Sequence, residues 1–292
     1  MFNATPAVTA YPSHSSYTNI LPSANLKLEI TKDVIARAAF SKTISRPIFS
    51  DLGGLDFNAT QLLINRHGNP DLKPFTSTNF DFGFEWYFNR TGILSSNFFY
   101  KKLANFIIPV TTPNVHLFGV DFLSDTQPQN QSGGEIKGVE ITYQQPWSFL
   151  PSPLDGFGSQ LNFTFSDGEL NLKNGTPVAF PGISKFSFNG ALYYEKGPIS
   201  IRAAYTKRSK FLLLPDGTFG QNVWHAPYQQ LDLTASVKVR HGVEVFGEVL
   251  NLTNQTDLIF SSNKADPAFD MSRPQSRSMV GRRFGFGVRA SF

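Results

Sequence analysis

The chain has 292 residues, no cysteine and a formal net charge of +4, with its 26 Lys and Arg residues dispersed along the sequence. The lack of cysteine excludes a disulfide scaffold and a thiolate metal site, and the weak, dispersed positive charge argues against a nucleic-acid-binding surface. No segment approaches the ~18 consecutive apolar residues that a membrane-spanning helix requires, so a helical membrane protein is excluded as well.

Aromatic side chains are unusually abundant. The chain contains 29 Phe, 9 Tyr and 3 Trp, although its mean hydropathy is only −0.19. A soluble core rarely needs so many rings. A lipid-facing band of β-strands with aromatic girdles does, and such strands are apolar only at alternate positions.

Residues 1–16 are rich in Pro, Ser, Thr and Ala and are expected to form a loop segment. From Leu26 onward, segments alternate apolar and polar residues with the period of two that is typical of β-strands. The clearest segment covers residues 80–88, where four Phe and one Trp occupy the even positions. The predicted strands cover residues 26–30, 34–40, 79–88, 93–108, 139–144, 157–165, 186–194, 199–206, 230–238, 243–249 and 283–292.

The connections between these strands alternate in length. Tight turns are predicted around residues 31–33, 89–92, 195–197 and 240–242, and long loops over 44–74, 112–133, 167–182, 209–226 and 253–277. Outer-membrane barrels show this alternation because their periplasmic turns are short and their external loops are long.

The final fifteen residues, SMVGRRFGFGVRASF, form one apolar face and one polar, small face. A soluble domain seldom ends this way because an unpaired strand edge invites aggregation. In a membrane barrel the last strand closes against the first, and its apolar face meets lipid. Four side chains on this face are expected to form a C-terminal signal for the barrel assembly machinery: Phe284, Phe286, Val288 and Phe292.

These patterns predict an all-β protein, an antiparallel transmembrane β-barrel. A β-sandwich is disfavoured because the alternate face is polar in nearly every strand, whereas a sandwich buries a bulky apolar face. Single-chain bacterial barrels have an even number of strands. We therefore expect a partial barrel of about 11 strands out of 22. Because residues 1–16 do not resemble a signal peptide, we also expect the chain to be the C-terminal part of a longer one.

Charged residues of both signs occupy the polar face of the predicted strands. They are expected to face the barrel lumen, where they would contact a plug and a polar substrate path, or simply line a water-filled space. The candidates are Arg37, Asp81, Glu85, Glu140, Arg202, Asp232, Lys238, Glu244, Glu248 and Arg289.

Rings and hydrogen-bonding groups in the external loops are the candidates for ligand contact, because saccharides stack on aromatic rings and siderophores offer polar, often aromatic faces. These candidates are Phe118, Trp224, His225 and Tyr228. For Trp224 and Tyr228 the alternative is the outer aromatic girdle. No catalytic motif occurs and the five His residues are scattered, so we expect neither enzymatic activity nor a cofactor nor a metal site.

Several motifs are more specific than the alternation. They are the run YTNILPSANLKLEITKDVIARAAFSKTISRPIFSDL (17–52), GNPDLKP (68–74), TNFDFGFEWYF (78–88), EIKGVEITYQ (135–144), VFGEVLNLTN (245–254) and GRRFGFGVRASF (281–292). Over nearly the whole chain from Tyr17 onward, they resemble the distal barrel half of TonB-dependent outer-membrane receptors. The similarity is greatest to the large branch often tied to carbohydrate and other nutrient uptake.

This resemblance implies a 22-stranded barrel plugged by an N-terminal domain, with residues 17–292 as its C-terminal part and the plug absent from this sequence. The implied function is active transport across the outer membrane of a Gram-negative bacterium. The ligand would be a scarce nutrient: an iron-siderophore, cobalamin or an oligosaccharide. The implied partners are outer-membrane lipid and, through the missing N-terminal part, the TonB complex. A passive porin or translocator barrel and a surface β-rich carbohydrate-binding protein remain alternatives.

Overall fold

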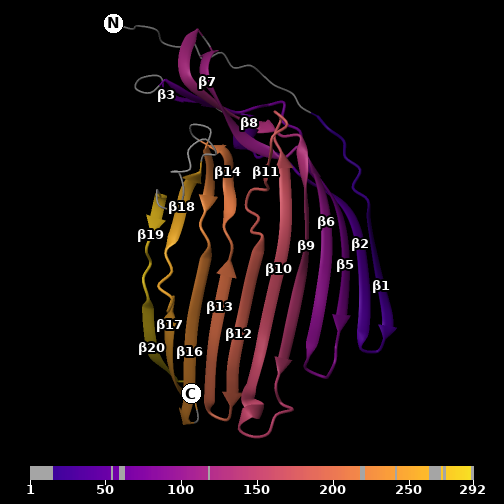
Figure 1. Ribbon diagram of the computed structural model, residues 1–292, viewed down its shortest axis with the longest axis vertical. Helices are drawn as coiled ribbons and strands as arrows, with labels where there is room; N and C mark the ends of the chain where they lie inside the picture. Colours follow the sequence, from indigo (N-terminus) through magenta and orange to yellow (C-terminus); the bar gives the residue numbers. More distant parts are fainter. Residues whose placement is uncertain are drawn as a thin grey trace.

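The computed structural model describes residues 16–53, 55–58, 63–117, 119–217, 221–240, 242–262, 271 and 274–290. Eleven strands form the path of one large antiparallel sheet (Figure 1). In spatial order, which is also chain order, they are β1 (Ser23–Thr31), β2 (Val34–Ser45), β5 (Phe75–Trp86), β6 (Ile93–Ala104), β9 (Gly133–Pro146), β10 (Phe157–Asn171), β12 (Phe186–Lys196), β13 (Ile199–Arg208), β16 (Tyr228–Arg240), β17 (Val243–Leu250) and β20 (Arg283–Ala290). A short strand, β11 (Pro177–Ala179), pairs with β10 beside this path. The prediction of an all-β antiparallel sheet with about eleven long strands is confirmed.

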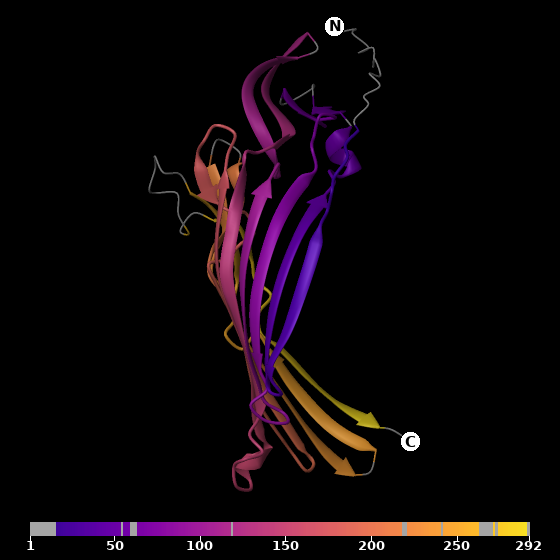
Figure 2. The ribbon, with the colours of Figure 1, turned by 90° about the vertical axis from the view of Figure 1, so that its right-hand side faces the viewer.

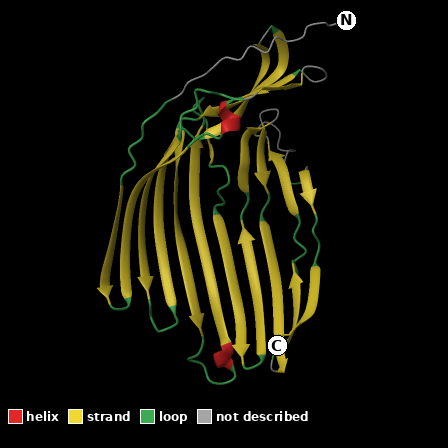
Figure 3. Ribbon diagram, turned by 180° about the vertical axis from the view of Figure 1, so that it is seen from behind, coloured by secondary structure: helices red, strands yellow, loops and turns green. Residues whose placement is uncertain are grey.

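The large sheet is open within the described residues. β1 and β20 form its two edges, and the sheet curves along its length (Figure 2). This is the arrangement expected of a partial barrel. Among the described residues no helix is long and apolar enough to cross a membrane. The two helical segments, α1 (Phe49–Leu52) and the 3-10 turn η1 (Leu154–Gly156), lie at opposite ends of the sheet (Figure 3).

The connections alternate as predicted, with tight turns at one end of the sheet and long loops at the other. We call these the short-turn end and the long-loop end. The long loops, however, are not irregular. One smaller sheet contains β3 (Leu55–Asn58), β4 (Ile64–His67), β7 (Ile107–Leu117) and β8 (Val120–Asn130), and the other contains β14 (Phe211–Gly217), β15 (Gln221–His225), β18 (Asp257–Ser262) and β19 (Pro274–Ser278).

The prediction that residues 44–74, 112–133, 209–226 and 253–277 form loops rather than strands is therefore wrong, because each of these segments contains strands. Most loop strands pair with their neighbours in the chain, but two pairings join distant segments: β4 with β8, in parallel, and β15 with β18. The predicted strand over 93–108 is confirmed from Ile93 to Ala104, but its end is misplaced, because Asn105 adopts a φ of 60° before β7 begins. That left-handed backbone ends the strand and starts the loop.

The two faces of the large sheet differ in chemistry. One face, which we call the apolar face, carries rings such as Phe80 and Phe98, each 50% exposed, and on β20 Phe286, which is 92% exposed. Neighbouring rings contact one another across strands, as do Phe40 and Phe80, whose centroids lie 5.2 Å apart. An extended apolar surface of this kind indicates contact with lipid or with another molecule.

The opposite face, the polar face, carries three rings that each lie opposite a glycine of a neighbouring strand. Phe99 lies opposite Gly138, Tyr193 opposite Gly158 and Phe246 opposite Gly287. A Cβ on Gly138 would lie 2.5 Å from the Phe99 ring and 2.2 Å from the Phe165 carbonyl oxygen. The missing side chain therefore makes room for the ring, which covers the bare backbone of the glycine.

A small hydrophobic core lies where the polar face meets the long loops. Its buried members come from strands and loops together and are Leu103, Ile108, Ile136, Leu170, Leu172 and Phe180. Burying a side chain of this size stabilises a structure by about 1.5–3 kcal/mol. The core therefore anchors the loops between β6 and β9 and between β10 and β12 to the sheet.

Candidate ligand-binding pocket at the long-loop end

The register of the strands places all ten charged candidates on the polar face. Arg37 lies opposite Gly83 of β5, so it shares a face with Asp81 and Glu85. Lys238 lies opposite Glu244, which lies opposite Arg289. The strands between them bring Glu140, Arg202, Asp232 and Glu248 to the same face.

Some of these charges are paired and some are not. Arg37 Nε donates to Glu85 Oε1 at 2.6 Å, and Arg289 Nη1 donates to Glu244 Oε2 at 3.0 Å. Asp232 accepts the backbone N–H of Asn251 at 2.7 Å. Among the described residues, Asp81, Glu140 and Glu248 have no hydrogen-bond or salt-bridge partner. The unpaired carboxylates remain available to another molecule on this face.

A cavity of about 480 Å³ opens on the polar face at the long-loop end. Its polar wall is formed by side chains of β2, β5 and β6: Ser41, Thr43, Ser77, Asn79, Asp81 and Lys101. Its apolar wall is formed by Phe75, Leu103, Phe106, Ile136 and Phe180, which also belong to or pack against the core beneath the loops. The cavity is thus polar on the strand side and aromatic on the loop side.

Asn79 holds the polar wall together. Its Nδ2 donates to Ser41 Oγ at 3.2 Å and to Thr43 Oγ1 at 3.3 Å, while its Oδ1 accepts from Ser77 Oγ at 2.7 Å. The Lys101 ammonium reaches the same Oδ1 at 3.5 Å. Because Asn79 is only 7% exposed, its network fixes the positions of the hydroxyl groups and leaves Lys101 and Asp81 to meet a ligand.

The aromatic wall depends on ring contacts between loops. The Phe106 centroid lies 5.3 Å from that of Phe75 and 4.8 Å from that of Phe180. Edge-to-face pairs at such distances contribute about 0.5–1.5 kcal/mol beyond the buried area. Phe180, from the loop between β10 and β12, is thereby held against Phe106, which in turn contacts Phe75 at the start of β5.

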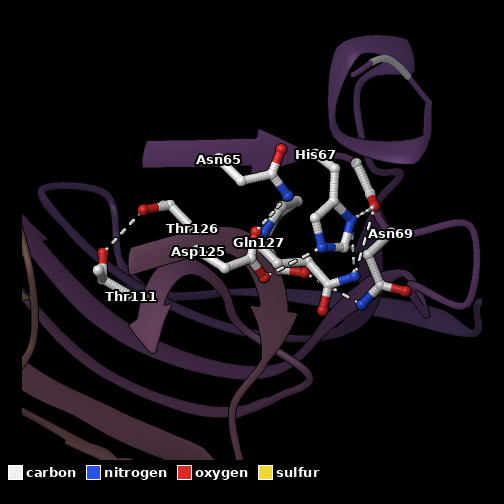
Figure 4. Close-up of polar contacts among 9 residues, drawn as sticks. Asn65, His67, Asn69, Thr111, Asp125, Thr126 and Gln127 are labelled. Carbon is white, nitrogen blue, oxygen red and sulfur yellow. Dashed lines mark hydrogen bonds and ion pairs between the residues drawn. The ribbon is translucent and has the colours of Figure 1, made fainter. Parts of the chain in front are cut away.

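A second polar network joins β4 to β8 in the loop sheet above the pocket (Figure 4). His67 Nε2 lies 3.1 Å from Asp125 Oδ2, and Asn65 Nδ2 donates to Asp125 Oδ1 at 2.8 Å. Asn69 Nδ2 donates to the Pro128 carbonyl oxygen at 3.0 Å. These contacts fix the loop between β2 and β5 against the hairpin of β7 and β8.

The predicted ligand contacts lie elsewhere on the loop side. Trp224 and His225 belong to β15; Trp224 Nε1 donates to Ser262 Oγ at 2.8 Å, and His225 stacks on Phe211 with centroids 4.8 Å apart. Tyr228 begins β16 on the polar face, opposite Arg208. The alternative assignment of Tyr228 to the outer girdle is therefore wrong, since its side chain points away from the apolar face. None of the three lines the pocket.

Two candidates, Phe118 and Phe292, lie outside the described residues. Phe284, Phe286 and Val288 lie on the apolar face of β20, and their role as an assembly signal stays a prediction. Sequence reasoning placed Asp81 on the polar face but missed Lys101 and the His67 network. Phe99 and Leu103 share the face of Lys101, so large apolar neighbours obscured the polar side of β6, and the pairing of β4 with β8 left no local signal.

Comparison with known proteins places this geometry in a family. The family described as "TonB dependent receptor-like, beta-barrel" matches residues 2–252. A comparison with curated protein sequences finds no match.

The fold is similar to several solved structures. A variant of the ferric enterobactin receptor PfeA from Pseudomonas aeruginosa, in complex with enterobactin, has a TM-score of 0.67 at 19% identity, covering 94% of this chain and 41% of that chain. The siderophore receptor PirA from Pseudomonas aeruginosa has a TM-score of 0.61 at 16% identity, with coverages of 94% and 42%. The copper transporter OprC has a TM-score of 0.64 at 16% identity, with coverages of 92% and 39%.

The chain spans less than half the length of these structures, and their low identity shows a shared fold alone. The match to the family over residues 2–252 agrees with the open antiparallel sheet and with its apolar and polar faces. The chain belongs to the TonB-dependent receptor-like β-barrel family.

Proposed function

We propose that this chain is the ligand-facing barrel part of an outer-membrane receptor that imports a scarce nutrient with energy supplied through TonB. In this proposal the apolar face meets outer-membrane lipid and the polar face lines the lumen against a plug domain. The long-loop end faces the medium, because outer-membrane barrels have long external loops. The receptor is a transporter and not an enzyme.

The pocket at the long-loop end is the observation that carries the ligand-binding part of this proposal. It combines an ammonium group, a carboxylate without a partner, hydroxyl groups and aromatic rings. Such a wall suits a ligand with several oxygen atoms and a flat or apolar surface. A ferric siderophore, cobalamin and an oligosaccharide all have these features. The solved structures of similar fold include receptors for ferric enterobactin and a copper transporter, so the fold alone does not identify the ligand class.

The unpaired charges of the polar face support contact with a plug. Asp81, Glu140 and Glu248 have no salt bridge within the described residues, and a plug with complementary charges would pair with them. We assign recognition by the barrel assembly machinery to the apolar residues of β20. We assign contact with the TonB complex to a plug and N-terminal segment of the whole receptor.

Uptake measurements test the proposal. Cells that produce the whole receptor would be given labelled ferric siderophores, cobalamin or oligosaccharides, with TonB present or deleted. We expect uptake of one ligand class that depends on both the receptor and TonB. Uptake that continues without TonB would instead identify a passive barrel. A receptor fraction that is soluble without detergent would identify a surface carbohydrate-binding protein.

A further inference from the structure

The apolar face has a groove across β1, β2, β5 and β6, at about the middle of β2, β5 and β6. Its volume is about 610 Å³, and its apolar walls include Leu26, Phe40, Phe80, Phe82, Phe98 and Tyr100. Leu26 is 65% exposed and Phe98 is 50% exposed, so the rings are open to whatever surrounds the sheet. A groove lined by rings on a lipid-facing surface has the shape and chemistry to hold an acyl chain.

Two lysines stand at the long-loop end of this groove and on the same face. Lys42 lies opposite Thr78, and Thr78 lies opposite Lys102. Because adjacent strands are about 4.8 Å apart, the Cα atoms of the two lysines are separated by roughly 10 Å. Two lysine side chains and the intervening hydroxyl can therefore converge on one anionic group.

Lys42 has no acidic side chain opposite it on β5, and Lys102 has one acidic neighbour, Glu135, whose charge partly offsets its own. Lys102 lies opposite Glu135, but Glu135 already accepts from Tyr100 Oη at 3.0 Å and from Lys137 Nζ at 3.1 Å. Within the part of the chain that the structure describes, neither Lys42 nor Lys102 forms a salt bridge. Both side chains are exposed.

The same strands differ at their short-turn end. There the basic residues are Lys32 and Arg90, which lie in turns outside the strands rather than beside the groove. The apolar face at that end is formed by neutral side chains such as Val34, Trp86 and Leu94. A cationic pair above an aromatic groove is thus a feature of one end only.

We infer that this surface binds a phosphorylated, acylated glycolipid of the outer leaflet. Lys42, Thr78 and Lys102 hold a phosphate group, and the groove beneath them holds an acyl chain. The ammonium groups attract the phosphate and the threonine hydroxyl donates a hydrogen bond to it. The inference rests on the proposed function, because it requires the apolar face to lie in the outer membrane.

The test uses the whole receptor in detergent, titrated with diphosphorylated lipid A and followed by native mass spectrometry. A basic residue near an anionic membrane surface contributes roughly fivefold in affinity, so Lys42→Gln with Lys102→Gln should weaken binding by about tenfold to thirtyfold. The matched control removes two charges from the short-turn end of the same strands, with Lys32→Gln and Arg90→Gln, and should bind like the unchanged receptor. Replacement of both groove lysines by Arg should restore binding.

Three results would overturn the inference. They are unchanged affinity in the Lys42→Gln, Lys102→Gln variant, an equal loss in the control variant, and equal binding of dephosphorylated lipid A. Ligand uptake is measured on the same variants. If uptake depends on TonB while the affinity for lipid A is the same with and without the two lysines, the lipid-binding site is refuted and the proposed function is retained. If the receptor is not found in the outer membrane, the proposed function fails first.

Discussion

Asn79 and Lys101 show how single side chains build the candidate pocket. Asn79 is buried and satisfies three hydroxyl-bearing neighbours, whereas Lys101 keeps its ammonium at the cavity wall with one long contact of 3.5 Å. Asn79 therefore fixes the geometry of the pocket wall, and the Lys101 ammonium is available to bind a ligand. The two therefore give separable effects on mutation.

Lys101→Ala tests the binding role. A hydrogen bond from a charged group contributes about 1.5–3 kcal/mol, so the variant should bind its ligand roughly tenfold to a hundredfold more weakly. Isothermal titration of the whole receptor with the ligand identified by uptake measures this. Lys185→Ala removes an exposed lysine outside the cavity and should leave affinity unchanged. Equal affinities for both variants would place the ligand elsewhere.

Leu170→Ala tests the small core beneath the loops. Leu170 is fully buried, so the cavity left behind should cost about 2–5 kcal/mol and loosen the loops packed on it. Limited proteolysis should then cut the segment between β10 and β12 faster. Leu192, on the apolar face of β12, is 46% exposed, so Leu192→Ala should change proteolysis little. Equal sensitivity in the two variants would show that the core does not anchor the loops.

At the scale of the strand, the glycine–ring pairs explain the exceptions to alternation. Phe99, Tyr193 and Phe246 are large apolar rings on the polar face, which the period of two does not predict. Each covers a glycine directly opposite on the next strand. The sequence shows the rings and glycines separately, but only the register joins them.

Gly138→Val should disrupt the sheet. Its Cβ would lie 2.2 Å from the Phe165 carbonyl oxygen, so the backbone of β10 would have to move away. We expect a clear loss of folded receptor in the outer-membrane fraction, measured by heat-modifiable migration in gels. Gly247→Ala is the control, since its nearest neighbour would be 3.8 Å away. Normal folding of Gly138→Val would refute the close approach of β9 and β10.

The strands of the large sheet could be predicted because their surroundings impose a simple pattern. A face exposed to lipid and a face exposed to water require alternation over the whole strand, as residues 80–88 illustrate. The loop strands lie under no such constraint, and the pairings of β4 with β8 and of β15 with β18 join distant segments. Accordingly, the strand at Ile64–His67 and its partner β8 were missed. The pocket was missed for a related reason, because Lys101 and Phe180 meet only after the loops have packed.

At the scale of the whole molecule, the three proposed contacts depend on the two faces of one open sheet. The apolar face carries half-exposed rings, the polar face carries ten charged candidates, and the loops gather at one end. The proposals for ligand, plug and lipid each assign a partner to one of these surfaces. If the faces met different environments from those proposed, all three assignments would fail together.

Cysteine labelling tests this claim most directly, because the chain has no cysteine of its own. Asn97 and Phe98 are consecutive in β6; Asn97 lies opposite Gly83 on the polar face, and Phe98 lies opposite Phe82 on the apolar face. In whole receptor embedded in membranes, a water-soluble maleimide should label Asn97→Cys readily and Phe98→Cys slowly. Faster labelling of Phe98→Cys, or equal labelling of the two, would contradict a polar face in water and an apolar face in lipid.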